Sequence, residues 1–129
     1  MKSVKVMLAV LLMVFALSAT VSVQAETVEE CQVLINHVQD DLDAVYAAGG
    51  IGGNHPERTY GSLSSKLEGA FEKLDEGKYE DALGKLQDFA DAVTAMRDAP
   101  KPKLSADDAN LLLGDVNEAI ACVEMLLAP

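Results

Sequence analysis

Residues 28–45 read VEECQVLINHVQDDLDAV, and their apolar side chains recur every three or four positions. This spacing places them along one side of an α-helix and leaves the acidic residues on the other sides. Thr27 and Glu30 form a capping-box pattern that satisfies free amides of a first turn, so the helix is expected to begin there. The glycine pair at 49–50 predicts its end. The apolar stripe comprises Val28, Cys31, Ile35, Val38, Leu42 and Val45.

The next segment, residues 51–58, reads IGGNHPER and contains two glycines, an asparagine and a proline. Helix is therefore not expected to continue through it. A second helix is expected from about Ser62, where an apolar stripe resumes. Gly77 predicts its end, because glycine readily adopts the left-handed conformation that closes a helix.

A third helix is expected to follow directly from Tyr79 and to stop at Pro100. A fourth is capped by Ser105, with Asp107 and Asp108 at its positive end. Four apolar stripes joined by short connections predict an all-α fold. The expected architecture is one antiparallel four-helix bundle over residues 26–129, either up-down-up-down or built from two packed helical hairpins.

Residues 1–25 have the three parts of a secretory signal peptide. Two lysines precede an apolar run at residues 6–17, and the segment ends in the small residue Ala25. The apolar run is shorter than the ~20 residues that a membrane-spanning helix needs, and no second long run follows. We therefore expect a cleaved signal peptide, no membrane span, and export to the periplasm or the extracellular space.

The chain contains two cysteines, Cys31 and Cys122, and a single disulfide is the natural pairing in an exported protein. In an up-down-up-down bundle the first helix starts at the end where the last helix stops, so the two cysteines are nearly level. A redox site or a metal pair is less well supported, because there is no C-x-x-C spacing and no nearby histidine. The sequence predicts a Cys31–Cys122 disulfide.

The formal charge of −11 includes two lysines of the signal peptide, so the chain without residues 1–25 carries −13. Such acidity makes nucleic acid and anionic membrane surfaces poor partners. It is typical of a solvated surface that keeps an exported protein in solution. A specific basic partner or a cation site is the alternative.

Few residues could carry chemistry. His37 falls beside the apolar stripe of the first helix, and His55 lies in the glycine-rich loop. No nucleophile is paired with a base by spacing. The chain also lacks the C-x-x-C-H and Glu-x-x-His motifs of attached haem and di-iron sites. We therefore expect no catalytic residues, no metal site and no cofactor, and we do not expect an enzyme.

Short motifs at the helix boundaries and on the apolar stripes form a pattern of their own. They are Gly50-Ile51, Ser62-Leu63-x-x-Lys66-Leu67-x-x-Ala70, Leu74-x-x-Gly77-x-Tyr79-x-x-Ala82-x-x-x-Leu86-x-x-Phe89-x-x-x-Val93-x-Ala95, Leu104-Ser105 and Ala109-x-x-Leu112. This pattern resembles the FIMAH domain, a small helical module of larger secreted bacterial proteins. The chain departs from it at 100–102, where two prolines lengthen a turn. The resemblance implies an accessory, non-catalytic role and transfers no active-site residues.

The expected function is that of a small exported accessory protein that binds another exported or envelope protein, as a monomer or weak oligomer. Ile51 and Tyr60 are the candidate contact residues, because apolar and aromatic side chains exposed on an acidic surface often mark interfaces. The alternative is a periplasmic carrier of a small ligand or a metal. Its site would lie between helices or near His37 and His55.

Overall fold

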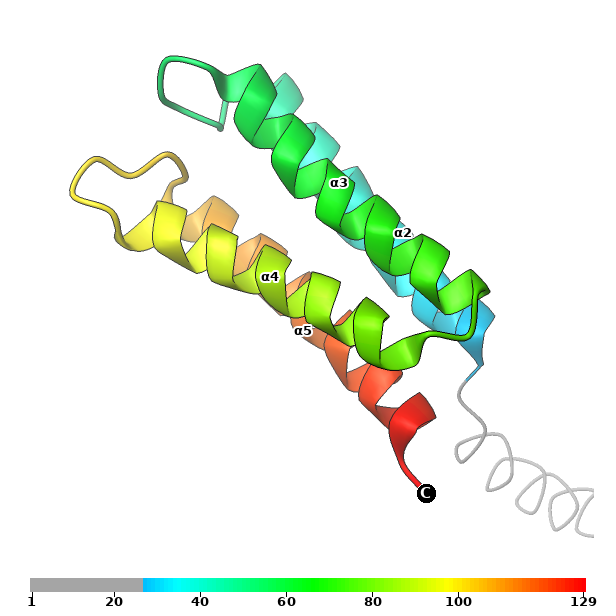
Figure 1. Cartoon of the computed structure of the whole chain (residues 1–129). Coiled ribbons are helices and arrows are strands. Elements are labelled where there is room, and N and C mark those ends of the chain that lie inside the picture. Colours follow the sequence, from blue (N-terminus) through cyan, green and yellow to red (C-terminus); the bar gives the residue numbers. More distant parts are fainter. Residues whose placement is uncertain (1–26) are drawn as a thin grey trace, which may run out of the picture.

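The computed structural model describes residues 27–129, which form a bundle of four antiparallel α-helices (Figure 1). The helices are α2 (Val28–Ala47), α3 (Pro56–Asp75), α4 (Tyr79–Asp98) and α5 (Ala106–Leu127), and residues 27–129 contain no strand. Both α2 and α4 pack against α3 and α5, which closes a ring of four neighbours. The loops after α2 and after α4 lie at one end of the bundle, and the turn between α3 and α4 lies at the other (Figure 1). The predicted all-α bundle is confirmed, while the predicted signal peptide at 1–25 lies outside the described residues.

Three predicted helix boundaries are confirmed by their caps. The Thr27 hydroxyl accepts a hydrogen bond from the backbone N–H of Glu30 at 3.1 Å, at the start of α2. The Ser105 hydroxyl accepts one from the backbone N–H of Asp108, also at 3.1 Å, at the start of α5. Gly77 follows α3 with a φ of 77°, the left-handed conformation that closes a helix. These caps satisfy backbone groups that helix ends leave unpaired.

The predicted start of the second helix near Ser62 is wrong, because α3 already begins at Pro56. Proline suits a first helical turn, since its φ is fixed near the helical value and its missing N–H would have no partner there. The apolar stripe that resumes at Leu63 marks where α3 reaches the core. The residues of α3 before it are helical but exposed or half-buried.

A hydrophobic core runs through the bundle and takes residues from all four helices. Its largest fully buried side chain is Phe89 of α4. The two end loops contribute Ile51 and Leu104, which are 4% and 1% exposed. These loops are joined by a hydrogen bond of 2.8 Å from the backbone N–H of Gly52 to the carbonyl of Lys103. The expectation that Ile51 is exposed is therefore wrong, because its loop folds over the end of the bundle and buries it.

The predicted disulfide is confirmed. Cys31 of α2 and Cys122 of α5 are bonded, with their Cα atoms 5.5 Å apart. Both residues are buried, and 91 positions separate them in the chain. The bond therefore joins the first and last helices at the end of the bundle opposite the two loops. Among the helices of residues 27–129, none is long and apolar enough to cross a membrane.

Candidate functional site

Helix α2 has polar residues on both sides of its buried stripe. On the side of α3, Gln39 and Asp43 make hydrogen bonds to residues of that helix. On the side of α5, His37 and Asp41 lie near Asp115. The helix therefore takes part in two separate polar sites, one on each flank.

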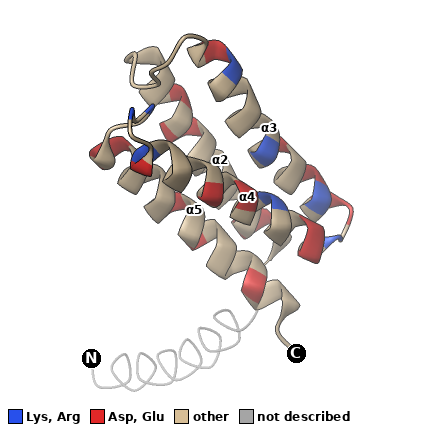
Figure 2. Cartoon of the chain, turned by 60° about the vertical axis from the view of Figure 1, so that its left-hand side comes forward, with Lys and Arg blue, Asp and Glu red and all other residues tan. Residues whose placement is uncertain are grey.

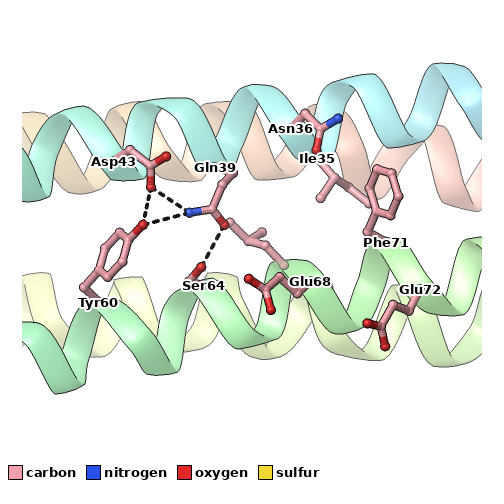
Figure 3. Close-up of a pocket in the computed structure, with 10 residues that line it drawn as sticks. Ile35, Asn36, Gln39, Asp43, Tyr60, Ser64, Glu68, Phe71 and Glu72 are labelled. Carbon is pink, nitrogen blue, oxygen red and sulfur yellow. Dashed lines mark hydrogen bonds between the residues drawn. The ribbon is translucent and has the colours of Figure 1, made fainter.

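The first site is a groove between α2 and α3, with a volume of about 460 Å³ (Figure 3). We call it the α2–α3 groove. Apolar residues in its lining come from both helices and pack in or against the core. They are Ile35, Leu67 and Phe71. Three carboxylates also line the groove, and no lysine or arginine is among its lining residues in the described chain. The carboxylates belong to Asp43, Glu68 and Glu72.

A hydrogen-bonded network closes one end of this groove (Figure 3). Gln39 lies at its centre: its Nε2 donates to Asp43 at 2.8 Å, and its Oε1 accepts from the Ser64 hydroxyl at 3.1 Å. The Tyr60 hydroxyl donates a short hydrogen bond to the same Asp43 oxygen. The network ties the N-terminal half of α3 to the C-terminal half of α2.

Tyr60 packs against a second aromatic ring, and the pKa of its hydroxyl is raised. Its ring stacks on that of Tyr46, with centroids 4.4 Å apart and planes 18° from parallel. The hydrogen bond to Asp43 raises the pKa of the Tyr60 hydroxyl, and partial burial and the negative charge of Asp43 act in the same direction. The weaker contacts with Ser64 and Gln39 lower it and do not cancel the rise.

Further along the same pair of helices, a buried amide joins α2 to the C-terminal turn of α3. The Nε2 of Gln32 donates to the carbonyl of Phe71 at 3.2 Å and to the carboxylate of Asp75 at 2.7 Å. Gln32 is the one buried polar or charged residue in the described part of the chain. Its amide therefore replaces lost hydration with two protein hydrogen bonds and fixes the register of α2 against α3.

The second site lies between α2 and α5. The Nε2 of His37 is 3.7 Å from a carboxylate oxygen of Asp41 and 3.8 Å from one of Asp115. We call these three residues the α2–α5 cluster. The side chain of His37 is 60% exposed, whereas those of Asp41 and Asp115 are 25% and 15% exposed. Their nitrogen and oxygen atoms are close enough together to hold one metal ion.

The structure places the predicted site residues in different surroundings. Ile51 belongs to the core, and Tyr60 lies at one end of the α2–α3 groove. His37 belongs to the α2–α5 cluster, but His55 lies in the loop before α3, where its Nδ1 is 3.5 Å from a carboxylate oxygen of Glu57. The two histidines therefore do not share a site.

Sequence reasoning missed Asp115, although a signal for it exists. His37 lies six residues after Cys31, and Asp115 lies seven residues before Cys122. In antiparallel helices joined at those cysteines, residues at such matched offsets are nearly level. The groove residues Gln39, Ser64 and Glu68 had no comparable signal, because no disulfide fixes α2 against α3.

Comparison with known proteins adds no assignment. No protein-family model matches the chain, and no curated protein and no solved structure matches it. The resemblance to the FIMAH domain therefore remains a prediction.

Proposed function

We propose that this chain is an exported, non-catalytic interaction protein whose α2–α3 groove binds a basic segment of another exported or envelope protein. The observation that supports this most is the lining of the groove. Apolar residues from both helices lie beside three carboxylates, with no lysine or arginine among the described lining residues to neutralise them.

Lysine and arginine side chains suit such a groove chemically. Their aliphatic stems can lie along apolar surface while their charged ends reach carboxylates. Charge-assisted hydrogen bonds to Glu68 and Glu72 would fix the position of the charged ends. Phe71 offers an aromatic ring in the same groove, and such rings attract cations at their faces.

The charge of the whole chain supports the same class of partner. An excess of acidic residues accelerates encounter with a basic protein and disfavours encounter with nucleic acid or anionic membrane. Figure 2 shows Asp and Glu residues along the helices of the bundle. The network of Tyr60, Asp43 and Gln39 is prearranged, which reduces the ordering cost of binding.

Photo-crosslinking in the native host tests this proposal. A photoreactive amino acid replaces Asn36, an exposed residue that lines the groove and is not one of its three carboxylates, and in a second strain it replaces Asp91, an exposed acid on α4 outside the groove. We expect a crosslinked protein at position 36 that is absent at position 91. Adding Glu72→Lys should weaken that crosslink, because it introduces a repelling cation into the groove.

The outcome at the two positions distinguishes binding in the groove from non-specific association with the protein surface. Equal crosslinking at 36 and 91, or a crosslink at 36 that Glu72→Lys leaves unchanged, would contradict an acidic groove as the binding site. Absence of any specific product at position 36 would contradict it as well.

A further inference from the structure

The α2–α5 cluster combines one imidazole with two carboxylates from neighbouring helices. His37 and Asp41 are one helical turn apart on α2, so they lie on the same face of that helix. Asp115 joins them from α5, whose position against α2 is fixed by the disulfide. All three ligand atoms lie within 4.8 Å of one another.

We propose that His37, Asp41 and Asp115 bind a divalent transition-metal ion, with zinc as the expected occupant. Zinc accepts a mixture of imidazole nitrogen and carboxylate oxygen ligands. Calcium and magnesium prefer sites built from oxygen alone, so the imidazole favours zinc over them. This site is separate from the α2–α3 groove and does not depend on the function proposed for the groove.

The distances from His37 to the two carboxylates suit such an ion after a small adjustment. Zinc lies about 2.0–2.2 Å from nitrogen and oxygen ligands, so tetrahedral ligand atoms are about 3.4 Å apart. The distances of 3.7 and 3.8 Å from His37 Nε2 to the two carboxylates exceed this by a few tenths of an ångström. The exposed His37 side chain has room to close that difference. Its exposure also leaves a position open for water as a further ligand.

Asp115 provides a second, independent observation. Its Oδ2 is shut off from solvent and has no hydrogen-bond partner among residues 27–129. A buried carboxylate oxygen without a partner is costly, because its lost hydration is not replaced. A cation held by the same carboxylate would compensate that charge.

The surroundings of the cluster contain no competing cation on either of its helices. Neither α2 nor α5 has a lysine or an arginine. The lysine and arginine residues of the described chain lie on α3, on α4 and in the loops (Figure 2). Both helices that form the cluster carry several carboxylates besides its own. The local field therefore attracts a cation to His37 and its two neighbours.

Calorimetric titration of the oxidised protein with zinc chloride tests the site. His37→Gln removes the imidazole, and Asp115→Asn removes the charge of the mostly buried carboxylate. His55→Gln is the matched control, because it removes the other histidine of the chain, which also lies near a carboxylate, that of Glu57. Circular dichroism of each variant checks that the fold is retained, which is expected because His37 is mostly exposed.

We expect one zinc ion per chain, bound equally well after His55→Gln. Loss of an outer hydrogen-bond partner of a metal ligand already costs about 10–100-fold in affinity, so losing the His37 ligand should cost at least as much. The Asp115→Asn variant should be weakened in the same way. In nuclear magnetic resonance spectra, zinc should shift the imidazole signals of His37 and leave those of His55 in place.

Three results would overturn the site. The first is an affinity for zinc that His37→Gln does not change. The second is calcium binding as tight as zinc binding, which would indicate a diffuse acidic surface. The third is the absence of zinc binding with a dissociation constant below about 1 mM, the range of weak binding.

Discussion

Tyr60 is constrained on two sides, by a stacked ring and by an acidic hydrogen-bond acceptor. Tyr46 packs against its ring, and Asp43 accepts its hydroxyl hydrogen. The sequence indicated Tyr60 as a contact residue because of its type and its position near a loop. It could not indicate Asp43 as its partner, because that pairing depends on how α3 lies against α2. The early start of α3 at Pro56, which was not predicted, places Tyr60 within the helix rather than in the loop.

The raised pKa of Tyr60 gives a prediction at this scale. Asp43→Asn removes the charged acceptor and should move the Tyr60 pKa back toward the usual value of about 10. Tyrosinate absorbance is titrated in the wild type and in Tyr60→Phe, and the difference between the two curves isolates Tyr60. The same pair of measurements is repeated in the Asp43→Asn background, and an unchanged midpoint there would contradict the assignment.

The sign of the linked stability follows from the same shift. A raised pKa means that folding favours the protonated hydroxyl. The stabilisation from this group is therefore fully present below about pH 10 and is lost as the pH rises through the folded-state pKa. The Tyr60→Phe variant lacks this ionisable hydroxyl, so its free energy of unfolding should decrease less at alkaline pH than that of the wild type. Urea unfolding at increasing pH measures the difference.

At the scale of the helices, the glycines differ in the space beside them, and the sequence alone could not show this difference. Gly84 and Gly114 lie inside α4 and α5, and close helix contact is one way to explain such residues. A Cβ atom built at either position meets nothing within 4 Å. Close contact therefore does not explain them, and each weakens its helix by roughly 1 kcal/mol relative to alanine.

Gly84→Ala is expected to stabilise the protein. Alanine has the higher helix propensity and reduces the freedom of the unfolded chain, so the free energy of unfolding should rise by about 0.5–1 kcal/mol. Thermal unfolding by circular dichroism measures this as an increase in the midpoint of several degrees. A lowered midpoint would mean that the space beside Gly84 is needed.

Gly50→Ala should have the opposite effect. Its Cβ would lie 2.8 Å from a methyl carbon of Val45 and 2.9 Å from both the Val45 carbonyl oxygen and an Asp108 carboxylate oxygen. The carbonyl belongs to the backbone and cannot move freely, so overpacking of this kind should cost about 1–3 kcal/mol. Urea unfolding of both variants tests whether Gly50→Ala lowers and Gly84→Ala raises the free energy of unfolding, as the contacts require.

On the scale of the whole molecule, the bundle could be predicted because its determinants are regular. Apolar spacing indicated all four helices, and the offsets of Cys31 and Cys122 from the bundle end supported their antiparallel order. The shape of the two end loops was not predictable in the same way. Ile51 is buried because its loop bonds to the loop before α5, a contact between segments about 50 residues apart that periodicity does not encode.

Loss of the disulfide should destabilise the entire bundle. The bond closes a loop of 91 residues, and the chain-entropy model assigns such a closure roughly 4–5 kcal/mol. Cys31→Ala combined with Cys122→Ala should lower the free energy of unfolding by up to that amount, as measured by urea denaturation. Reduction of the wild-type protein should give a similar loss, and an unchanged midpoint in both cases would mean that packing alone determines stability.

The same bond also decides how the molecule would carry a mechanical load. A pulling force applied at Val28 and Leu127, the outer ends of the first and last helices, reaches the disulfide at Cys31 and Cys122, which are next to each other. Because the covalent bond bridges those two points, tension passes through the sulfur atoms and bypasses α3, α4 and the parts of α2 and α5 that lie between the two cysteines. The oxidised protein should therefore extend very little under tension, whereas the reduced protein should unfold under the same force into a long, compliant chain.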